Sequence, residues 1–183
     1  MLSSFLLVAG LASGPQTTDD GGTIAAGSVR GVDASTRATI AEGCRRSLVF
    51  EDLVRVVERS TFIVYVEAVP ELRNGMKGAL LHSTSEAPYL RIQLKNDLTQ
   101  DQQVAVLAHE LQHVREVVQA GIHANAVEME MLFRRIGARR LSPGRRQQFE
   151  TAAALRVGDL VAADLRTKHD AGNVGSCNHG LAR

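Results

Sequence analysis

The sequence predicts an α+β domain, in which a short mixed or antiparallel sheet packs on a long helix and on further helices. Two observations support this class. Segments with β-branched or alternating apolar residues lie in the first half of the chain, and segments with helical periodicity fill the second half. The expected order is one helix, three strands and three helices, at residues 47–59, 61–66, 79–82, 89–94, 99–121, 124–136 and 145–168.

The first four elements follow from local patterns of apolar residues. Residues 47–59 repeat apolar side chains on one helical face, which indicates a helix. Residues 61–66 (TFIVYV) are mostly β-branched or aromatic, which favours a strand. Turn-forming residues at 70–78 separate this strand from two short strands at 79–82 and 89–94. Strict alternation in the last strand places its leucine and isoleucine side chains on the core face.

The ends of the three later helices are marked by particular residues. Thr99 is a good N-cap, and Gln102 stands three residues on, as in a capping box. Gly121 is placed to end this long helix. An apolar stripe predicts the next helix at 124–136, and glycine and proline residues separate it from a last helix at 145–168.

Both ends of the chain differ from the domain in composition. Residues 1–13 contain an apolar run followed by small residues, which is typical of a signal peptide; a leader that is merely disordered is the alternative, because a basic start is lacking. Residues 14–42 are rich in small and polar residues and are interpreted as a flexible linker. The domain is expected at 43–168, followed by a mobile tail at 169–183. A cleaved leader predicts export to a periplasm or out of the cell, and its absence would leave the protein in the cytoplasm.

Two cysteines, Cys44 and Cys177, flank most of the expected domain. In an exported protein they could form a disulfide that ties the tail to the first helix. Two unrelated thiols are the alternative, and the spacing alone favours neither.

The composition excludes several classes of protein. A formal net charge of +1 gives no electrostatic reason to expect a nucleic-acid partner. Aromatic residues make up only 4% of the chain and tryptophan is absent, so an aromatic platform for stacked bases is not expected. The longest uncharged apolar stretch, residues 5–12, is too short to span a bilayer. The composition names no function, and the oligomeric state stays open.

The long predicted helix contains the pattern His-Glu-x-x-His at residues 109–113. His109 and His113 project from one helical face a turn apart, so both imidazoles can bind one Zn²⁺. Glu110 lies about 100° around the helix from His109, so its carboxylate can reach a zinc-bound water without binding the metal. This spacing predicts a hydrolytic zinc site with Glu110 as the general base.

The segment AHELQH resembles the active-site helix of the zincin metallopeptidases. The longer stretch LAHELQHVREV is similar to a group of bacterial proteins that share the HELQH pattern. Those proteins also carry an F-E-T-x-A-A segment, found here at residues 149–154. The resemblance extends over residues 47–168. It implies a zincin-like fold, a zinc cofactor and a peptidase activity, and it does not indicate the substrate.

A catalytic zinc commonly has three protein ligands and one open position. The metzincin continuation would need a glycine and a histidine three and six residues after His113. Those positions hold Glu116 and Gln119, which excludes this subgroup. The remaining zincin pattern supplies a glutamate from a later helix. Glu116 shares a helical face with the two histidines and could orient one of them from behind, or it could be an ordinary solvated glutamate.

Glu150 is the first candidate for the third ligand, and Glu128 is the second. The small residues at 152–154 would let the helix of Glu150 approach the metal helix closely, and its ExxxA spacing resembles the ligand segment of the Glu-type zincins. Hairpin geometry favours Glu128 instead, because a chain that turns back at Gly121 returns to the level of the metal near that residue. Glu130 is less suitable, because it pairs naturally with an arginine four residues on.

Together these features predict a zinc-dependent hydrolase, most simply a metallopeptidase acting on a peptide or protein substrate. The strand at 89–94 precedes the metal helix, as the substrate-lining edge strand does in zincins, and an extended peptide could pair with it. A non-catalytic zinc-binding or partner-binding module of the same fold is the alternative, since no residue that would stabilise an oxyanion is evident. A helical domain without any metal is the third interpretation.

Overall fold

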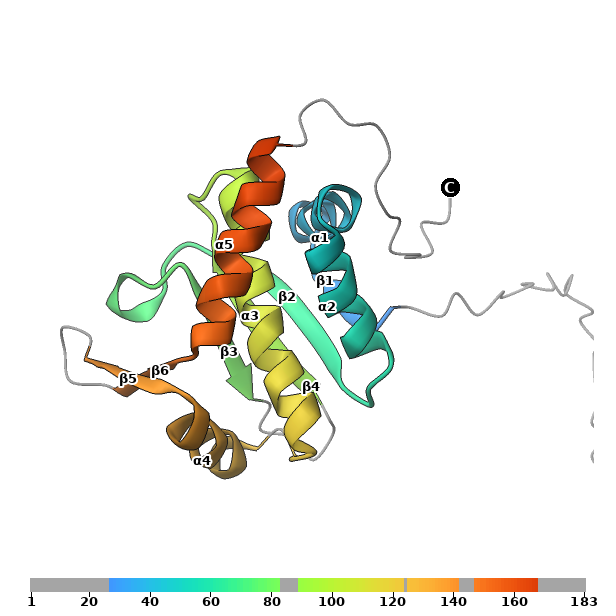
Figure 1. Ribbon diagram of the computed structural model, residues 1–183. Helices are drawn as coiled ribbons and strands as arrows, with labels where there is room; N and C mark the ends of the chain where they lie inside the picture. Colours follow the sequence, from blue (N-terminus) through green and yellow to red (C-terminus); the bar gives the residue numbers. More distant parts are fainter. Residues whose placement is uncertain (1–26, 83–88, 124, 142–146, 168–183) are drawn as a thin grey trace, which may run out of the picture.

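The computed structural model describes residues 27–82, 89–123, 125–141 and 147–167 (Figure 1). In these ranges the α-helices are α1 (Ala34–Arg46), α2 (Leu48–Glu58), α3 (Gln100–Ala120), α4 (Ala126–Ile136) and α5 (Ala152–Thr167). The strands are β1 (Val29–Gly31), β2 (Ile63–Val69), β3 (Gly78–His82), β4 (Tyr89–Lys95), β5 (Ala138–Leu141) and β6 (Gln147–Glu150). A short 3-10 helix, η1, spans Arg73–Gly75.

Four of the strands form one mixed sheet in the order β1-β2-β4-β3. The strands β1, β2 and β4 run parallel, and β3 pairs with β4 in the antiparallel direction. The strands β5 and β6 form a separate antiparallel hairpin. The predicted α+β class with a short mixed sheet is therefore confirmed, whereas a zincin-like arrangement of these elements stays a prediction.

Alternation along β2 and β4 places one face of the sheet in the core. The apolar residues on this face are almost completely buried: Val64, Val66, Leu90, Ile92 and Leu94. They belong to one continuous cluster with buried residues of α1, α2 and α3. Each fully buried side chain of this size contributes about 1.5–3 kcal/mol to stability. The core face predicted for residues 89–94 is confirmed.

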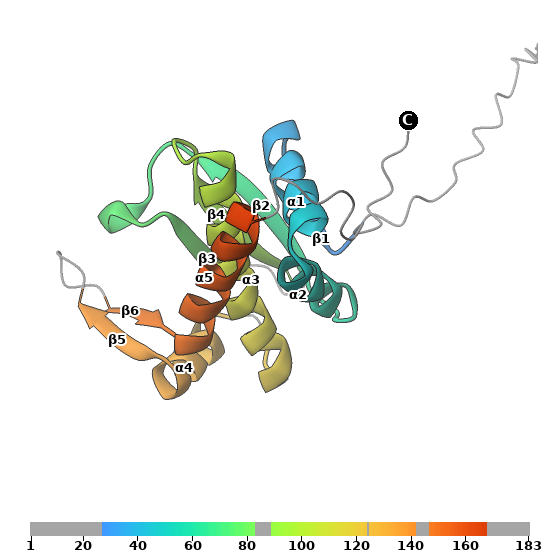
Figure 2. The ribbon, with the colours of Figure 1, turned by 45° about the horizontal axis from the view of Figure 1, so that its top comes forward.

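Helix α3 lies at the centre of the fold. The predicted capping box is present at its start, where Gln102 N donates to Thr99 Oγ1 and Thr99 N donates to the Gln102 side chain. The predicted end is present too, since Gly121 has a φ of 62°, a conformation that glycine adopts without a steric penalty. One side of α3 contacts β3 and β4, and another contacts α5. Figure 2 shows α3 and α5 side by side in front of these strands.

The chain before residue 43 is more ordered than its composition suggests. Strand β1 pairs with β2, and α1 enters the core through Ile40 and Cys44, each 1% exposed. The prediction of a flexible linker at residues 14–42 is therefore wrong from residue 27 onward. The buried face of α1 also contains Thr36 and Thr39, so this part of the sequence lacks the apolar repeat by which a helix is usually identified.

Several predictions concern residues that the structure does not describe. The signal peptide expected at 1–13 and the tail at 169–183 both lie outside the described residues, and so does Cys177. Its pairing with Cys44 stays a prediction. Within the described ranges, no helix combines the length and the apolar character needed to cross a membrane.

Two predicted elements near the candidate site are corrected by the structure. The helix expected at 145–168 begins only at Ala152, because residues 147–150 belong to strand β6. The hydroxyl of Thr151 accepts the N–H of Ala154 at 3.1 Å and caps the start of α5. The strand at 89–94 is not an edge strand, since β4 pairs with β2 on one side and β3 on the other. The edge of the sheet beside α3 is β3.

Candidate metal centre

The two histidines of the motif lie on one face of α3, as the four-residue spacing predicts. The imidazole centroids of His109 and His113 are 5.0 Å apart, and the ring planes are nearly perpendicular at 82°. The side chain of His113 is 8% exposed and that of His109 is 19% exposed. Both rings are therefore largely shielded from solvent but are still reachable from one side.

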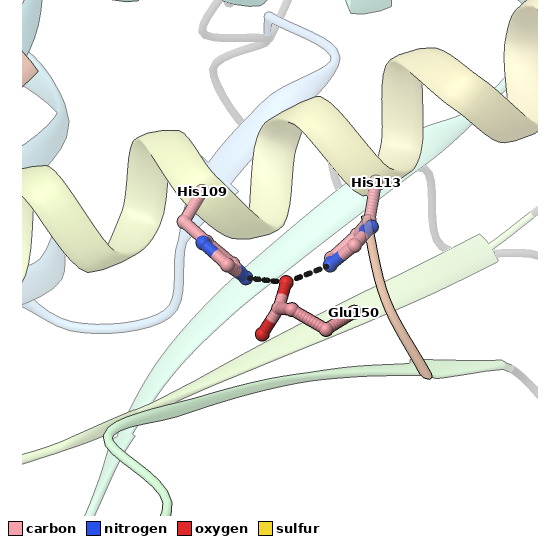
Figure 3. Close-up of side chains that lie close together, drawn as sticks. All are labelled: His109, His113 and Glu150. Atoms are coloured by element: carbon pink, nitrogen blue, oxygen red, sulfur yellow. Dashed lines mark ion pairs between the residues drawn. The ribbon is translucent and has the colours of Figure 1, made fainter. Parts of the chain in front are cut away.

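Glu150 lies opposite the two imidazoles, at the end of β6 (Figure 3). Its Oε1 atom is 3.0 Å from His109 Nε2 and 3.6 Å from His113 Nε2. One ligand atom from each of the three residues lies within 4.8 Å of the other two. The structure thus brings together the three residues that the sequence analysis ranked first, although Glu150 comes from a strand end and not from within a helix.

The donor set and its surroundings fit a divalent transition metal. Two imidazole nitrogens and one carboxylate oxygen form the ligand set that catalytic zinc sites use. Among the described residues, Glu150 Oε1 is buried and has no hydrogen bond of good geometry, despite its closeness to the imidazoles. Burial by itself would raise the pKa of Glu150, but His109 and His113 outweigh it and lower the pKa to about 2. The carboxylate is therefore ionised, as a metal ligand must be.

The carboxylate of Glu116 lies at the ring nitrogen of His113 that faces away from Glu150. Its Nδ1 atom is 2.9 Å from Glu116 Oε2, and both side chains are buried. Burial would lower the pKa of His113, but Glu116 and Glu150 together raise it to about 9. The ring of Phe133, from α4, packs edge-on against the imidazole with centroids 5.2 Å apart. The predicted place of Glu116 beside a histidine is what the structure shows, whereas Phe133 was recognised only as part of an apolar stripe.

Glu116 also contacts the residue that follows Glu150. Thr151 Oγ1 donates to Glu116 Oε1 at 2.7 Å, and Thr151 is 3% exposed. Burial would raise the pKa of Glu116, but the bonds from His113 and Thr151 outweigh it and lower the pKa. Thr151 is not among the predicted site residues; its signal in the sequence is that of a helix N-cap, which also marks the start of α5.

Glu110 projects from α3 towards the edge strand β3. It is buried, and the nearby backbone N–H of Leu80 favours its ionised form. Burial raises the pKa of Glu110 above its usual value, although the two imidazoles act in the opposite direction. A carboxylate of raised pKa close to two candidate ligands is suited to proton transfer.

The absence of a side chain at Gly78 makes room for Glu110. A Cβ atom at this position would lie 2.8 Å from Glu110 Oε1 and 2.5 Å from Val106 Cγ1. Such distances are well below the usual separation of non-bonded atoms. The sequence predicts Gly78 as a turn residue, but a glycine inside a strand often marks a close approach of another element.

The alternative ligand Glu128 is engaged elsewhere. Its carboxylate accepts the backbone N–H of His123 at 2.8 Å and the side-chain amide of Asn125 at 3.0 Å, both near the start of α4. It is absent from the group formed by the two motif histidines and Glu150. Glu130 pairs with Arg134 at 2.6 Å on the exposed face of α4, which confirms that expectation.

Comparisons with known proteins assign the chain to no family. Neither protein-family models, nor curated proteins, nor solved structures match it. The assignment of a function therefore depends on the geometry of the site.

Proposed function

We propose that this protein is a zinc-dependent hydrolase, most simply a metallopeptidase. The observation that carries the proposal is the convergence of His109, His113 and Glu150 next to the buried carboxylate of Glu110. Two imidazoles and a carboxylate supply three ligands, and a base lies beside them on the same helix. A purely structural zinc site would not need this fourth residue.

The residues of the chain divide the chemical work between them. Zinc, when bound, supplies a Lewis acid that polarises a carbonyl group and lowers the pKa of water. His109, His113 and Glu150 would hold the ion. Glu110 would take a proton from the attacking water and deliver it to the leaving amine, a role for which its raised pKa is suitable.

Strand β3 is the proposed docking edge for an extended substrate. Among the described residues it pairs only with β4, and its Leu80 backbone lies near Glu110. A peptide that added to this edge by main-chain hydrogen bonds would lie beside the candidate metal centre. An extended substrate is therefore expected to pair with β3, and not with the strand at residues 89–94.

Exchange of Glu110 for glutamine tests the proposal. Glu110→Gln should retain zinc, measured by elemental analysis, and should lose about 10²–10⁴-fold in the hydrolysis of a fluorogenic peptide library. Glu130→Gln is the matched control, because its carboxylate lies exposed on α4. Unchanged hydrolysis in Glu110→Gln would contradict the role of this residue as the base.

A non-catalytic zinc-binding module is the second candidate function. The observation that favours it is the backbone N–H of Leu80 near the buried Glu110 carboxylate, a contact that would hold this side chain in place. In this case the wild-type protein would bind one zinc ion tightly and would hydrolyse no member of the library. The Glu110→Gln variant would then differ from wild type only in stability.

A further inference from the structure

We propose that Thr151 and Glu116 form a positioning pair, which sets the distance between the histidines of α3 and Glu150 before any metal binds. The inference rests on the proposed metal site and does not depend on hydrolysis. Neither residue would contact the metal. Their effect would be transmitted through His113 on one side and through the backbone of Glu150 on the other.

The carboxylate of Glu116 joins the two parts of the site. Its Oε2 atom lies 2.9 Å from His113 Nδ1, and its Oε1 atom accepts the Thr151 hydroxyl at 2.7 Å. All three side chains are buried. Because an ionised carboxylate only accepts hydrogen bonds, the imidazole must donate from Nδ1. Once the ring is neutral, its lone pair is therefore on Nε2, the atom that would bind a metal.

Thr151 transmits the restraint to the third ligand. It follows Glu150 directly, and its hydroxyl accepts the N–H of Ala154 while donating to Glu116. The same oxygen therefore caps the start of α5 and links it to Glu116 on α3. A shift of Thr151 would move Glu150 with it, and metal sites tolerate deviations of only about 0.5 Å before function suffers.

An N-cap role alone makes a different prediction from a positioning role. Loss of a cap costs helix stability, about 0.5–2 kcal/mol, and would do so whether or not Glu116 were present. A positioning pair instead predicts that the effects of the two residues on zinc affinity are coupled. A double-mutant cycle on zinc affinity separates the two roles.

The experiment measures zinc affinity by competition with a chromophoric chelator, for the whole chain at constant pH. Thr151→Val and Glu116→Ala should each lower the affinity by about 10–100-fold. The double variant should lose little more than either single variant. Thr151→Ser, which keeps the hydroxyl, should bind zinc about as tightly as wild type. The control Thr167→Val, at the exposed end of α5, should leave the affinity unchanged.

Thr151→Asp covers the case in which the valine variant does not fold. Aspartate is a good N-cap, so α5 should still form, but its carboxylate would face that of Glu116 and repel it. Its zinc affinity should fall while its helix content stays that of wild type.

The possible results distinguish failure of the positioning pair from failure of the proposed hydrolase. Losses that add in the double variant, or an unchanged affinity in both Thr151→Val and Thr151→Asp, would overturn the positioning pair. Coupled losses in a protein that hydrolyses nothing would support the pair and overturn only the hydrolase. A wild-type protein that binds no zinc would overturn both.

Discussion

Replacement of Gly78 by alanine is expected to destabilise the protein and to displace Glu110. The added Cβ would lie 2.5 Å from Val106 Cγ1 and 2.8 Å from Glu110 Oε1. Non-bonded carbon atoms normally lie about 3.5–4.0 Å apart, so Val106 must retreat by about 1 Å. Glu110 must move by a somewhat smaller distance. Overpacking of a dense interior on this scale costs about 1–3 kcal/mol.

Gly158→Ala is the matched control for this substitution. A Cβ at Gly158 in α5 would lie 3.5 Å from His109 Cβ, an ordinary van der Waals contact. Alanine inside a helix is more favourable than glycine by about 0.5–1 kcal/mol. The same chemical change should therefore destabilise the protein at β3 and stabilise it at α5.

The assay is urea denaturation of the two variants and of wild type in the presence of a chelator. Val106→Ala in the Gly78→Ala background removes the first close contact and leaves the second. It should recover part of the stability lost in Gly78→Ala and not all of it, since the contact with Glu110 remains. A Gly78→Ala protein as stable as wild type would refute the reasoning, because it would show that Val106 and Glu110 move aside without a loss of stability.

Three other expectations follow from the same structure. Glu150→Ala should lower zinc content sharply, whereas Glu128→Ala should leave it unchanged; elemental analysis decides, and the reverse pattern would reassign the third ligand. In the metal-free protein, burial would lower the pKa of His113, but Glu116 and Glu150 raise it to about 9. Its contribution to stability is complete below about pH 6.5 and is lost as the pH rises through about 9, so urea midpoints should fall over this interval; a flat profile would contradict this. Arg46→Met should cost about 1–3 kcal/mol, because the buried guanidinium bonds two carboxylates and the end of α5; thermal unfolding within error of wild type would count against it.

Local signals made parts of the fold predictable from the sequence. Helix α3 was located at both ends, because a capping box and a left-handed glycine are short motifs that depend on a few residues. The alternation of β4 identified its buried face for the same reason. Signals of this kind do not depend on which element lies next to which.

Other parts depend on tertiary contacts and escaped the sequence analysis. The buried face of α1 includes two threonines, so its helix cannot be distinguished from a polar linker by periodicity. The order of the strands in the sheet also has no local signature. The sequence therefore predicts β4 as an edge strand, whereas β3 lies beyond β4 at the edge of the sheet. Strand β6 was read as helix because its residues carry no helix breaker, while its pairing with β5 decides its conformation.

The candidate site shows the same division. The spacing of His109, Glu110 and His113 follows from the geometry of a helix, so these positions could be named from the sequence. Glu150 and Glu128 could be separated only once their surroundings were known, since one faces two imidazoles and the other accepts hydrogen bonds from His123 and Asn125 near the start of α4. The contributions of Gly78 and Thr151 arise from contacts between distant segments, which a local pattern does not contain.

The order of the elements along the chain determines when the metal centre can form. The two histidines belong to α3, whereas Glu150 immediately precedes the start of α5, with α4 and the β5–β6 hairpin between them. N-terminal segments leave the ribosome first, so the sheet and α3 are made before Glu150 exists. A nascent chain that ends before Glu150 cannot hold a metal with all three candidate ligands. The proposed hydrolysis would therefore begin only after Glu150 has been synthesised.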